Sequence, residues 1–270
     1  MKIAASTTTT RDLPLADAVR LAGDLGYDAL EVWAEHVWEQ GVDPRRLGAA
    51  ATARGLALSV HGPIRDLNVT SSNPAIRAES QRQYLAGLET ARELGAAVVV
   101  VHPGAMSSSG DAPEAYWPAL EEFFGRLADR AGALGLRAGV ENMERRRLEI
   151  VTTTGLALRL VRAVDRPALG LALDVAHVLY NRDPLDVPAL LPHICHVHLS
   201  GSTATAVHVP LADGAYDLGP ALRALENTYG GIAAIEDYVP GRAPEVLAAN
   251  LEAMRALRRR TGAARSDAAR

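Results

Sequence analysis

Gly95-Ala-Ala-Val-Val-Val-Val-His-Pro-Gly104 holds a run of four valines that ends at an imidazole. The run favours a strand that is covered on both faces, because its apolar residues do not alternate with polar ones. A segment with helical periodicity, 73–94, precedes the run and ends at Gly95, a residue suited to a helix C-cap. A second helical segment, 113–134, follows. The stretch therefore indicates a strand between two helices, with His102 at the carboxyl end of the strand.

The same pattern, an apolar run that ends at a metal-binding or acid–base residue, recurs along the chain. The residues in this position are His61, His102, Glu141, Asp174, His198 and Glu236. Because the carboxyl ends of parallel strands lie at one face of a sheet or barrel, we expect these side chains to converge. Packing alone does not account for charged or imidazole side chains at this position so many times.

Eight strands that alternate with helical segments predict a single (β/α)8 barrel over residues 1–260. The strands are expected at Lys2–Ser6, Ala29–Trp33, Leu56–His61, Ala97–His102, Arg137–Val140 (leading to Glu141), Leu169–Asp174, His193–Leu199 and Ile232–Glu236. The helices are expected near 14–25, 43–54, 73–94, 113–134, 154–163, 184–191, 217–227 and 243–259. An open doubly wound sheet competes with the barrel, but it would not need functional residues on most strands. Residues 261–270 are expected to form a disordered tail.

Composition excludes several classes of protein. The formal charge of −4 gives no global positive potential to attract nucleic acid or an anionic membrane. Lys2 is the single lysine and lies in the first strand, far from the expected site, which excludes Schiff-base aldolases, pyridoxal enzymes and Walker-type loops. Cys195 is the single cysteine, which excludes an internal disulfide and a cysteine metal cluster. Without a signal-peptide-like or membrane-length apolar run, we expect a soluble cytoplasmic protein and leave a homo-oligomer open.

Glu141, Asp174, His198 and Glu236 end the fifth to eighth strands and predict a metal site. Three carboxylates and one imidazole suit Mn²⁺, Mg²⁺, Co²⁺, Fe²⁺ or Zn²⁺, and we expect manganese or zinc first. A single residue of this kind is explained as readily by a salt bridge at the barrel rim as by a metal. Four of them with few basic residues beside them would leave buried negative charge unpaired, which a cation neutralises.

Further side chains extend the candidate site. These are His61, His102, His177, His208, Trp33 and Arg145. The four histidines either bind a second metal or contact substrate, and the residues alone leave both alternatives open. Trp33 either packs the loop after the second strand or covers a ligand. Arg145 either meets an anionic group of a substrate or belongs to a solvated charge run. His196 has the strand parity of His198 but lies one layer deeper, so we expect a buried core histidine.

Motifs along most of the chain resemble those of the xylose isomerase-like barrel superfamily, which includes sugar-phosphate isomerases and epimerases, inosose dehydratases and endonuclease IV. The matching motifs are Val60-His-Gly-Pro63, Val101-His-Pro-Gly104, Val140-Glu-Asn-Met143, Leu173-Asp-Val-Ala-His177, His196-Val-His-Leu-Ser200, His208-Val-Pro-Leu-Ala-Asp-Gly214 and Ile235-Glu-Asp237. The resemblance implies a barrel whose shared metal ligands are Glu141, Asp174, His198 and Glu236. For the epimerase branch it implies that the two glutamates are also the acid–base pair.

The endonuclease IV branch is similar to this chain at further ligand positions, which match His61, His102, His177 and His208. Three departures argue against the nuclease activity of that branch. Ala206 stands where the resemblance implies an aspartate, and Gly201 stands where it implies an acidic residue. Ile64 occupies the position of an aromatic residue that intercalates into DNA.

Two functions follow as hypotheses. In the first, Glu141 and Glu236 remove and return a proton of a sugar, keto-sugar or polyol, with a metal polarising its oxygens, as in an isomerase, epimerase or related lyase. In the second, clustered metals activate water in a phosphodiesterase acting on abasic DNA, which requires a basic surface. The acidic net charge and the missing aspartate favour the small-molecule enzyme. No nucleic acid or membrane partner is expected.

Overall fold

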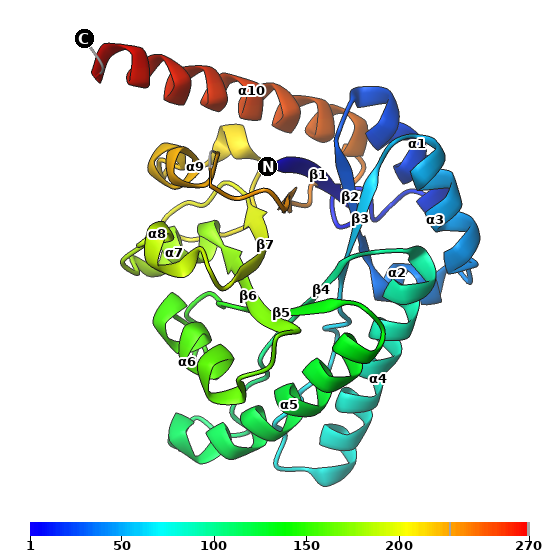
Figure 1. Ribbon diagram of the computed structural model, residues 1–270, viewed down its shortest axis with the longest axis vertical. Coiled ribbons are helices and arrows are strands. Elements are labelled where there is room, and N and C mark those ends of the chain that lie inside the picture. Colours follow the sequence, from blue (N-terminus) through cyan, green and yellow to red (C-terminus); the bar gives the residue numbers. More distant parts are fainter. Residues whose placement is uncertain (227, 269–270) are drawn as a thin grey trace.

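Eight parallel strands close into a barrel in sequence order, from β1 to β8 (Figure 1). The computed structural model describes residues 1–268 except 227, with side chains described as far as residue 260. The strands are β1 (Lys2–Ser6), β2 (Ala29–Trp33), β3 (Ala57–His61), β4 (Val98–Val101), β5 (Arg137–Glu141), β6 (Leu169–Asp174), β7 (Ile194–Leu199) and β8 (Ile232–Ile235). This arrangement confirms the predicted (β/α)8 barrel and rules out the open sheet.

Helices surround the barrel and connect successive strands (Figure 1). The α-helices are α1 (Leu15–Leu25), α2 (Ala34–Glu39), α3 (Pro44–Ala53), α4 (Pro74–Leu94), α5 (Trp117–Ala133), α6 (Thr154–Val164), α7 (Val175–Asn181), α8 (Val187–Leu190), α9 (Gly219–Glu226) and α10 (Ala243–Ala268). Two 3-10 turns are η1 (Pro113–Tyr116) and η2 (Leu211–Asp213). The disorder expected for 261–270 stays a prediction, because the side chains of 261–268 and all of 269–270 lie outside the described residues.

Two short helices, α2 and α7, begin directly after strands β2 and β6, where the sequence pattern predicts loops. Asp174 explains α7, since its Oδ1 accepts the backbone N–H of His177 at 2.7 Å and caps the helix. The helix expected at 184–191 is shorter and becomes α8, which starts after its own cap, Asp186. A side-chain cap of this kind fixes the residue at which a helix begins. Hydrophobic periodicity locates the same boundary only to within a few residues.

The strands' carboxyl ends form one mouth of the barrel, and the opposite end carries Lys2, paired in register with Ile232. All five residues of β2 are buried, as expected for a strand covered on both faces. Large apolar side chains such as Phe123, Phe124 and Leu160 fill the layer between the barrel and its helices. No helix among the described residues is long and apolar enough to cross a membrane.

Gly48→Ala is expected to lower the free energy of unfolding by about 1–3 kcal/mol, because α3 packs closely on the end of α4 at this point. A Cβ at Gly48 would lie 2.2 Å from the carbonyl oxygen of Leu94. Gly125 in the interior of α5 is the matched control, since a Cβ there meets nothing within 4 Å. Gly125→Ala should instead raise stability by up to about 1 kcal/mol. Urea denaturation measures both, and equal effects of the two substitutions would contradict the close packing of α3 on α4.

Candidate metal centre and active site

The four predicted metal ligands meet at the carboxyl-terminal mouth of the barrel. Glu141 ends β5, Asp174 ends β6, His198 lies one residue before the end of β7, and Glu236 directly follows β8. One ligand atom from each lies within 4.8 Å of the others. All four residues are buried, with exposures between 0% and 6%. We refer to these residues as the quartet.

Asp174 is held rigidly by its neighbours. The side-chain amide of Asn142 donates to the Asp174 carbonyl at 2.9 Å, and its oxygen accepts the Asp174 backbone N–H at 3.0 Å. One carboxylate oxygen, Oδ1, caps α7 through the His177 N–H. The other oxygen, Oδ2, is buried without a hydrogen bond to any described residue. Since buried polar atoms are normally paired, Oδ2 is left available for a ligand that the protein itself does not supply.

His198 lies between the carboxylates of the quartet. Its Nδ1 is 3.1 Å from Glu141 Oε1 and 3.2 Å from Glu236 Oε2. Burial alone would lower the pKa of His198, but the surrounding carboxylates of Glu31, Glu141 and Glu236 raise it well above its usual value. Burial would likewise raise the pKa of Glu141, but neighbouring imidazoles, His198 first, hold it well below its usual value. The charge of His198 and the charge of Glu141 therefore each depend on the protonation state of the other.

The residues of the quartet fit a divalent cation. Burial raises the pKa of Asp174 to about 7, and the nearby Glu141 carboxylate adds to this effect. The site thus gathers three carboxylates in a buried pocket, and one of their oxygens, Asp174 Oδ2, has no hydrogen bond to a described residue. Three carboxylates and one imidazole form a donor set for manganese, magnesium, cobalt or zinc.

Two pairs of histidines flank the quartet, and they include all four of the additional histidines predicted from the sequence. On one side, Nε2 of His61 and Nε2 of His102 lie 3.7 Å and 3.2 Å from Glu141 Oε2. On the other side, Nε2 of His177 lies 2.9 Å from Nε2 of His208, and both imidazoles are close to Asp174.

Backbone carbonyls orient one histidine of each pair. Nδ1 of His61 donates to the Gly62 carbonyl at 2.8 Å, and Nδ1 of His177 donates to the Asn142 carbonyl at 2.8 Å. In a neutral imidazole this leaves Nε2 with a lone pair toward the mouth, the orientation typical of a metal ligand or a hydrogen-bond acceptor. His208 adopts a left-handed backbone with φ 57°, a strained conformation that is common at functional sites.

A cavity of about 380 Å³ opens at the mouth, a size typical of small-molecule sites. Glu141 and Glu236 both belong to its wall. Trp33 also lines it, and its ring stacks on His61 with centroids 4.4 Å apart. The rest of the wall includes Thr8, Ile64, Leu67, Val69, Tyr84, His102, Met143, Glu144, Glu149, His177, His208, Asp237 and Tyr238.

The arginine in the described cavity wall is Arg146 rather than the predicted Arg145. Arg145 is exposed, and its backbone N–H donates to Asn181 Oδ1 at 2.7 Å. Arg146 pairs with Glu144 at 2.5 Å, and this glutamate is itself 3.4 Å from His177 Nε2. Arg146 is itself exposed and only borders the cavity, so sequence spacing identifies the basic run but not which of its side chains reaches the cavity wall.

Glu31 is a site residue that the pattern of strand ends does not predict. It lies in the middle of β2, is fully buried, and has its Oε2 atom 3.1 Å from His198 Nε2. His196, expected to be a core histidine, is fully buried and has Nε2 2.8 Å from the same oxygen. The sequence does contain one indication of this role, a carboxylate inside the otherwise apolar run Ala29–Trp33. A buried carboxylate is costly unless a polar or charged group pairs with it.

The fold and the quartet together define a class of protein. Residues 19–257 match the model of the xylose isomerase-like TIM barrel family, and the chain belongs to this family.

Comparison with individual proteins agrees with this assignment. A fructoselysine 3-epimerase of Shigella flexneri is 22% identical over 87% of this chain and 90% of its own length. The crystal structure of a D-tagatose 3-epimerase-like protein superposes with a TM-score of 0.80 at 22% identity, covering 96% of this chain and 99% of that chain. The IolI protein, solved with a bound zinc atom, superposes with a TM-score of 0.82 at 18% identity, covering 95% of this chain and 98% of that chain.

Proposed function

We propose that the protein is a divalent-metal-dependent epimerase or isomerase that removes and returns a proton on a carbon atom of a ketose or a related polyhydroxylated molecule. The observation that carries this proposal is the placement of Glu141 and Glu236. They come from β5 and β8, which are three strands apart in the barrel, and both line the same cavity. Both also lie beside Nδ1 of His198. A substrate carbon between them has one carboxylate on each side.

The geometry gives each glutamate a role. One carboxylate removes the proton next to the substrate carbonyl, and the other returns a proton to the opposite face, which inverts the carbon. A metal held by the quartet, manganese or zinc, would supply Lewis-acid polarisation of the substrate's carbonyl and hydroxyl oxygens. The flanking histidines offer hydrogen bonds to further hydroxyl groups, and the stacked ring of Trp33 offers an apolar wall.

The names of the relatives support a ketose as the substrate. The Shigella protein is a fructoselysine 3-epimerase, and a similar structure is that of a D-tagatose 3-epimerase-like protein. Epimerisation at C-3 requires proton removal from a carbon adjacent to a ketone, which is the chemistry that two opposed carboxylates perform. The zinc atom bound to the IolI protein supports a divalent metal in this protein as well.

Turnover in D₂O tests the proposal. Protein loaded with Mn²⁺ or Zn²⁺ and incubated with D-fructose, D-tagatose or D-psicose should form a C-3 epimer of at least one ketose. Proton NMR should show deuterium at C-3 of the product, because a carboxylate exchanges its proton with solvent when the site opens. Absence of both epimer and exchange for every ketose would contradict the assignment of the substrate class.

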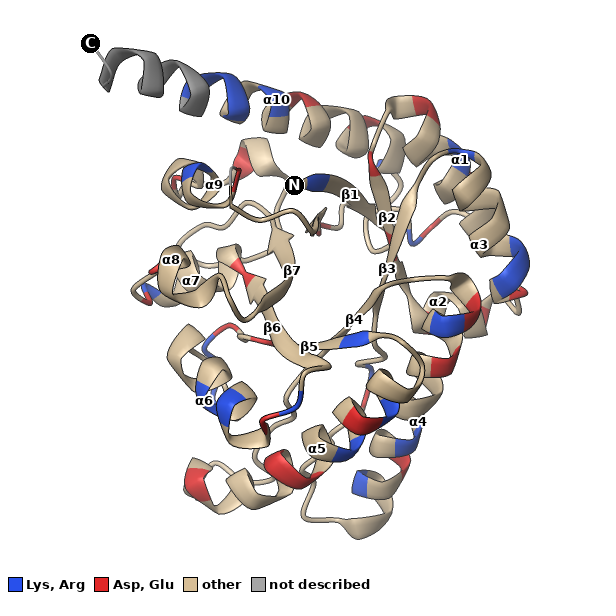
Figure 2. Ribbon diagram, viewed as in Figure 1, with Lys and Arg blue, Asp and Glu red and all other residues tan. Residues whose placement is uncertain are grey.

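A metal-dependent phosphodiesterase is the second candidate, since the two histidine pairs give the mouth donors for more than one ion. The charge distribution argues against it. Figure 2 shows acidic and basic residues interspersed on the outer helices, and the cavity wall includes the carboxylates of Glu144, Glu149 and Asp237. A DNA phosphate backbone requires a basic surface instead. Metal-dependent incision of an abasic duplex that is lost in Glu141→Ala would favour this candidate over the epimerase.

A further inference from the structure

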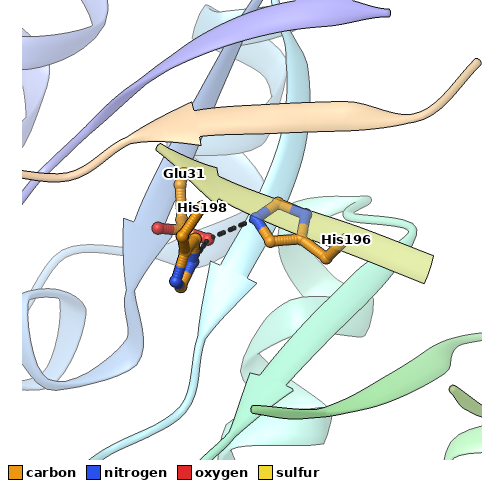
Figure 3. A group of neighbouring side chains, drawn as sticks. All are labelled: Glu31, His196 and His198. Carbon is orange, nitrogen blue, oxygen red and sulfur yellow. Dashed lines mark hydrogen bonds and ion pairs between the residues drawn. The ribbon is translucent and has the colours of Figure 1, made fainter. Parts of the chain in front are cut away.

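A carboxylate and an imidazole occupy the interior of the barrel directly beneath the quartet. Figure 3 shows Glu31 from β2 facing His196 and His198, which both come from β7. Glu31 Oε2 lies 2.8 Å from His196 Nε2 and 3.1 Å from His198 Nε2. Glu31 Oε1 accepts a long hydrogen bond of 3.4 Å from the Ser6 hydroxyl on β1. Groups from two other strands, β1 and β7, therefore hold this carboxylate of β2 in place.

Packing does not explain this arrangement. The interior of a (β/α)8 barrel is normally filled by branched apolar side chains. Glu31 and His196 are both fully buried, and a buried carboxylate is costly unless it is paired. Of its two close imidazole partners, one, His198, is a member of the quartet. The contact therefore connects the barrel interior to the site at its mouth.

The contact fixes which nitrogen of His198 faces the mouth. An imidazole that ligates a metal is neutral and carries a single N–H, and a carboxylate at Nε2 favours the tautomer that places the proton there. Nδ1, which lies 3.1 Å and 3.2 Å from the carboxylates of Glu141 and Glu236, is then the nitrogen that would bind the metal. Carboxylates that accept from the outer nitrogen of a metal-ligating histidine orient the ring and raise its basicity.

We infer that Glu31, held by His196 and Ser6, is a positioning residue that orients His198 for metal binding. This inference rests on the proposed function in so far as it requires a metal at the quartet. Glu31 acts through His198 and lies outside the cavity wall. Its contribution is to metal affinity and to the geometry of one ligand.

A metal bound within the Glu31 cluster itself is the competing explanation, because its three ligand atoms are also close together. It would require His198 to bridge two ions as an imidazolate, with both ring protons lost. Glu31 Oε2 already lies at ion-pair distance from His196 Nε2, at 2.8 Å, and at hydrogen-bond distance from His198 Nε2, at 3.1 Å, without an ion. The geometry therefore favours positioning.

Binding of Mn²⁺ to chelator-treated protein, followed through the EPR signal of the free ion, tests the inference. Glu31→Gln should weaken the Kd by roughly 10- to 100-fold, as expected for loss of a residue that supports a ligand. Glu35→Gln is the matched control. It removes another buried carboxylate, which accepts the backbone N–H groups of Ile64 and Arg65, and should leave the Kd within about twofold of wild type. His196→Gln should weaken the Kd by less than Glu31→Gln.

A second readout separates positioning from general loss of stability. The visible absorption bands of the Co²⁺-loaded protein should shift in Glu31→Gln and remain unchanged in Glu35→Gln, because only the former alters a ligand's orientation. Urea denaturation of the metal-free proteins tests whether each variant is folded, and His196→Gln serves as the test if Glu31→Gln is not folded.

Tight Mn²⁺ binding by wild type with an equal Kd and spectrum in Glu31→Gln would overturn this inference alone. Two ions in wild type and one in Glu31→Gln would favour the competing explanation. Failure of wild type to bind Mn²⁺ would overturn the proposed function as well.

Discussion

Glu141→Gln and Glu236→Gln will each lower kcat by on the order of 10²-fold or more with whichever ketose the protein epimerises. Glutamine preserves the shape of the side chain but is neither a base nor an acid at neutral pH. The two residues come from strands that are three apart and line one cavity, and in the proposed reaction they serve opposite faces of the substrate carbon, so neither replaces the other. The amide oxygen can still contact the metal, so metal affinity should fall less than kcat.

Steady-state kinetics and deuterium incorporation in D₂O measure this effect. Glu35→Gln is the control, because Glu35 is a buried carboxylate whose partners lie in the β3–α4 loop: the backbone N–H groups of Ile64 and Arg65, and the Arg65 guanidinium at 3.6 Å. It should retain wild-type kcat. If one glutamine variant exchanges the substrate proton without forming the epimer, the substituted residue is the one that returns the proton to the opposite face.

Two outcomes would contradict the acid–base roles. The first is wild-type activity in both glutamine variants. The second is turnover of a confirmed substrate without solvent deuterium in the product, which indicates direct hydride transfer between neighbouring carbons. In that case Glu141 and Glu236 would act as metal ligands and not as proton carriers.

The sequence predicted that several side chains meet at the mouth of the barrel, because each of these ends an apolar run. Glu141, Asp174 and His198 are recognisable locally, and the parallel topology alone brings them to one face. His61 and His102 were predicted for the same reason, whereas His177 and His208 were predicted from their positions three residues after Asp174 and in the loop after the seventh strand. Which ring nitrogen faces the mouth depends on carbonyls such as that of Gly62, which no pattern reveals.

Contacts across the barrel were not predictable in this way. Glu31 and His196 are 165 residues apart in the chain, and they meet because both side chains point into the barrel interior, one from β2 and the other from β7. A single carboxylate in an apolar run indicates that a partner exists but not where it lies. Arg146 borders the cavity in place of Arg145 and pairs with Glu144, a contact within the loop after β5 that sequence spacing does not reveal.

Asp174→Asn is expected to abolish tight metal binding while leaving the metal-free fold intact. The substitution removes the charge of Oδ2, the buried oxygen without a hydrogen bond to a described residue. It keeps an oxygen that can accept the His177 N–H, so the cap of α7 survives. The Kd for Mn²⁺ should rise by more than the roughly 10- to 100-fold typical of residues that only support a ligand. Equilibrium dialysis with metal analysis measures this directly.

Asp174→Ala separates the two roles of the same side chain. It should lose the metal as the asparagine variant does, but it also removes the cap and should lower the stability of the metal-free protein by about 1 kcal/mol. Urea denaturation in the presence of a chelator measures that difference. Metal at 100 times its Kd should stabilise wild type by about 2.7 kcal/mol and neither variant at the same concentration. Full metal occupancy in Asp174→Asn would show that the ion is held elsewhere, because the charge of Asp174 would then not be needed for binding.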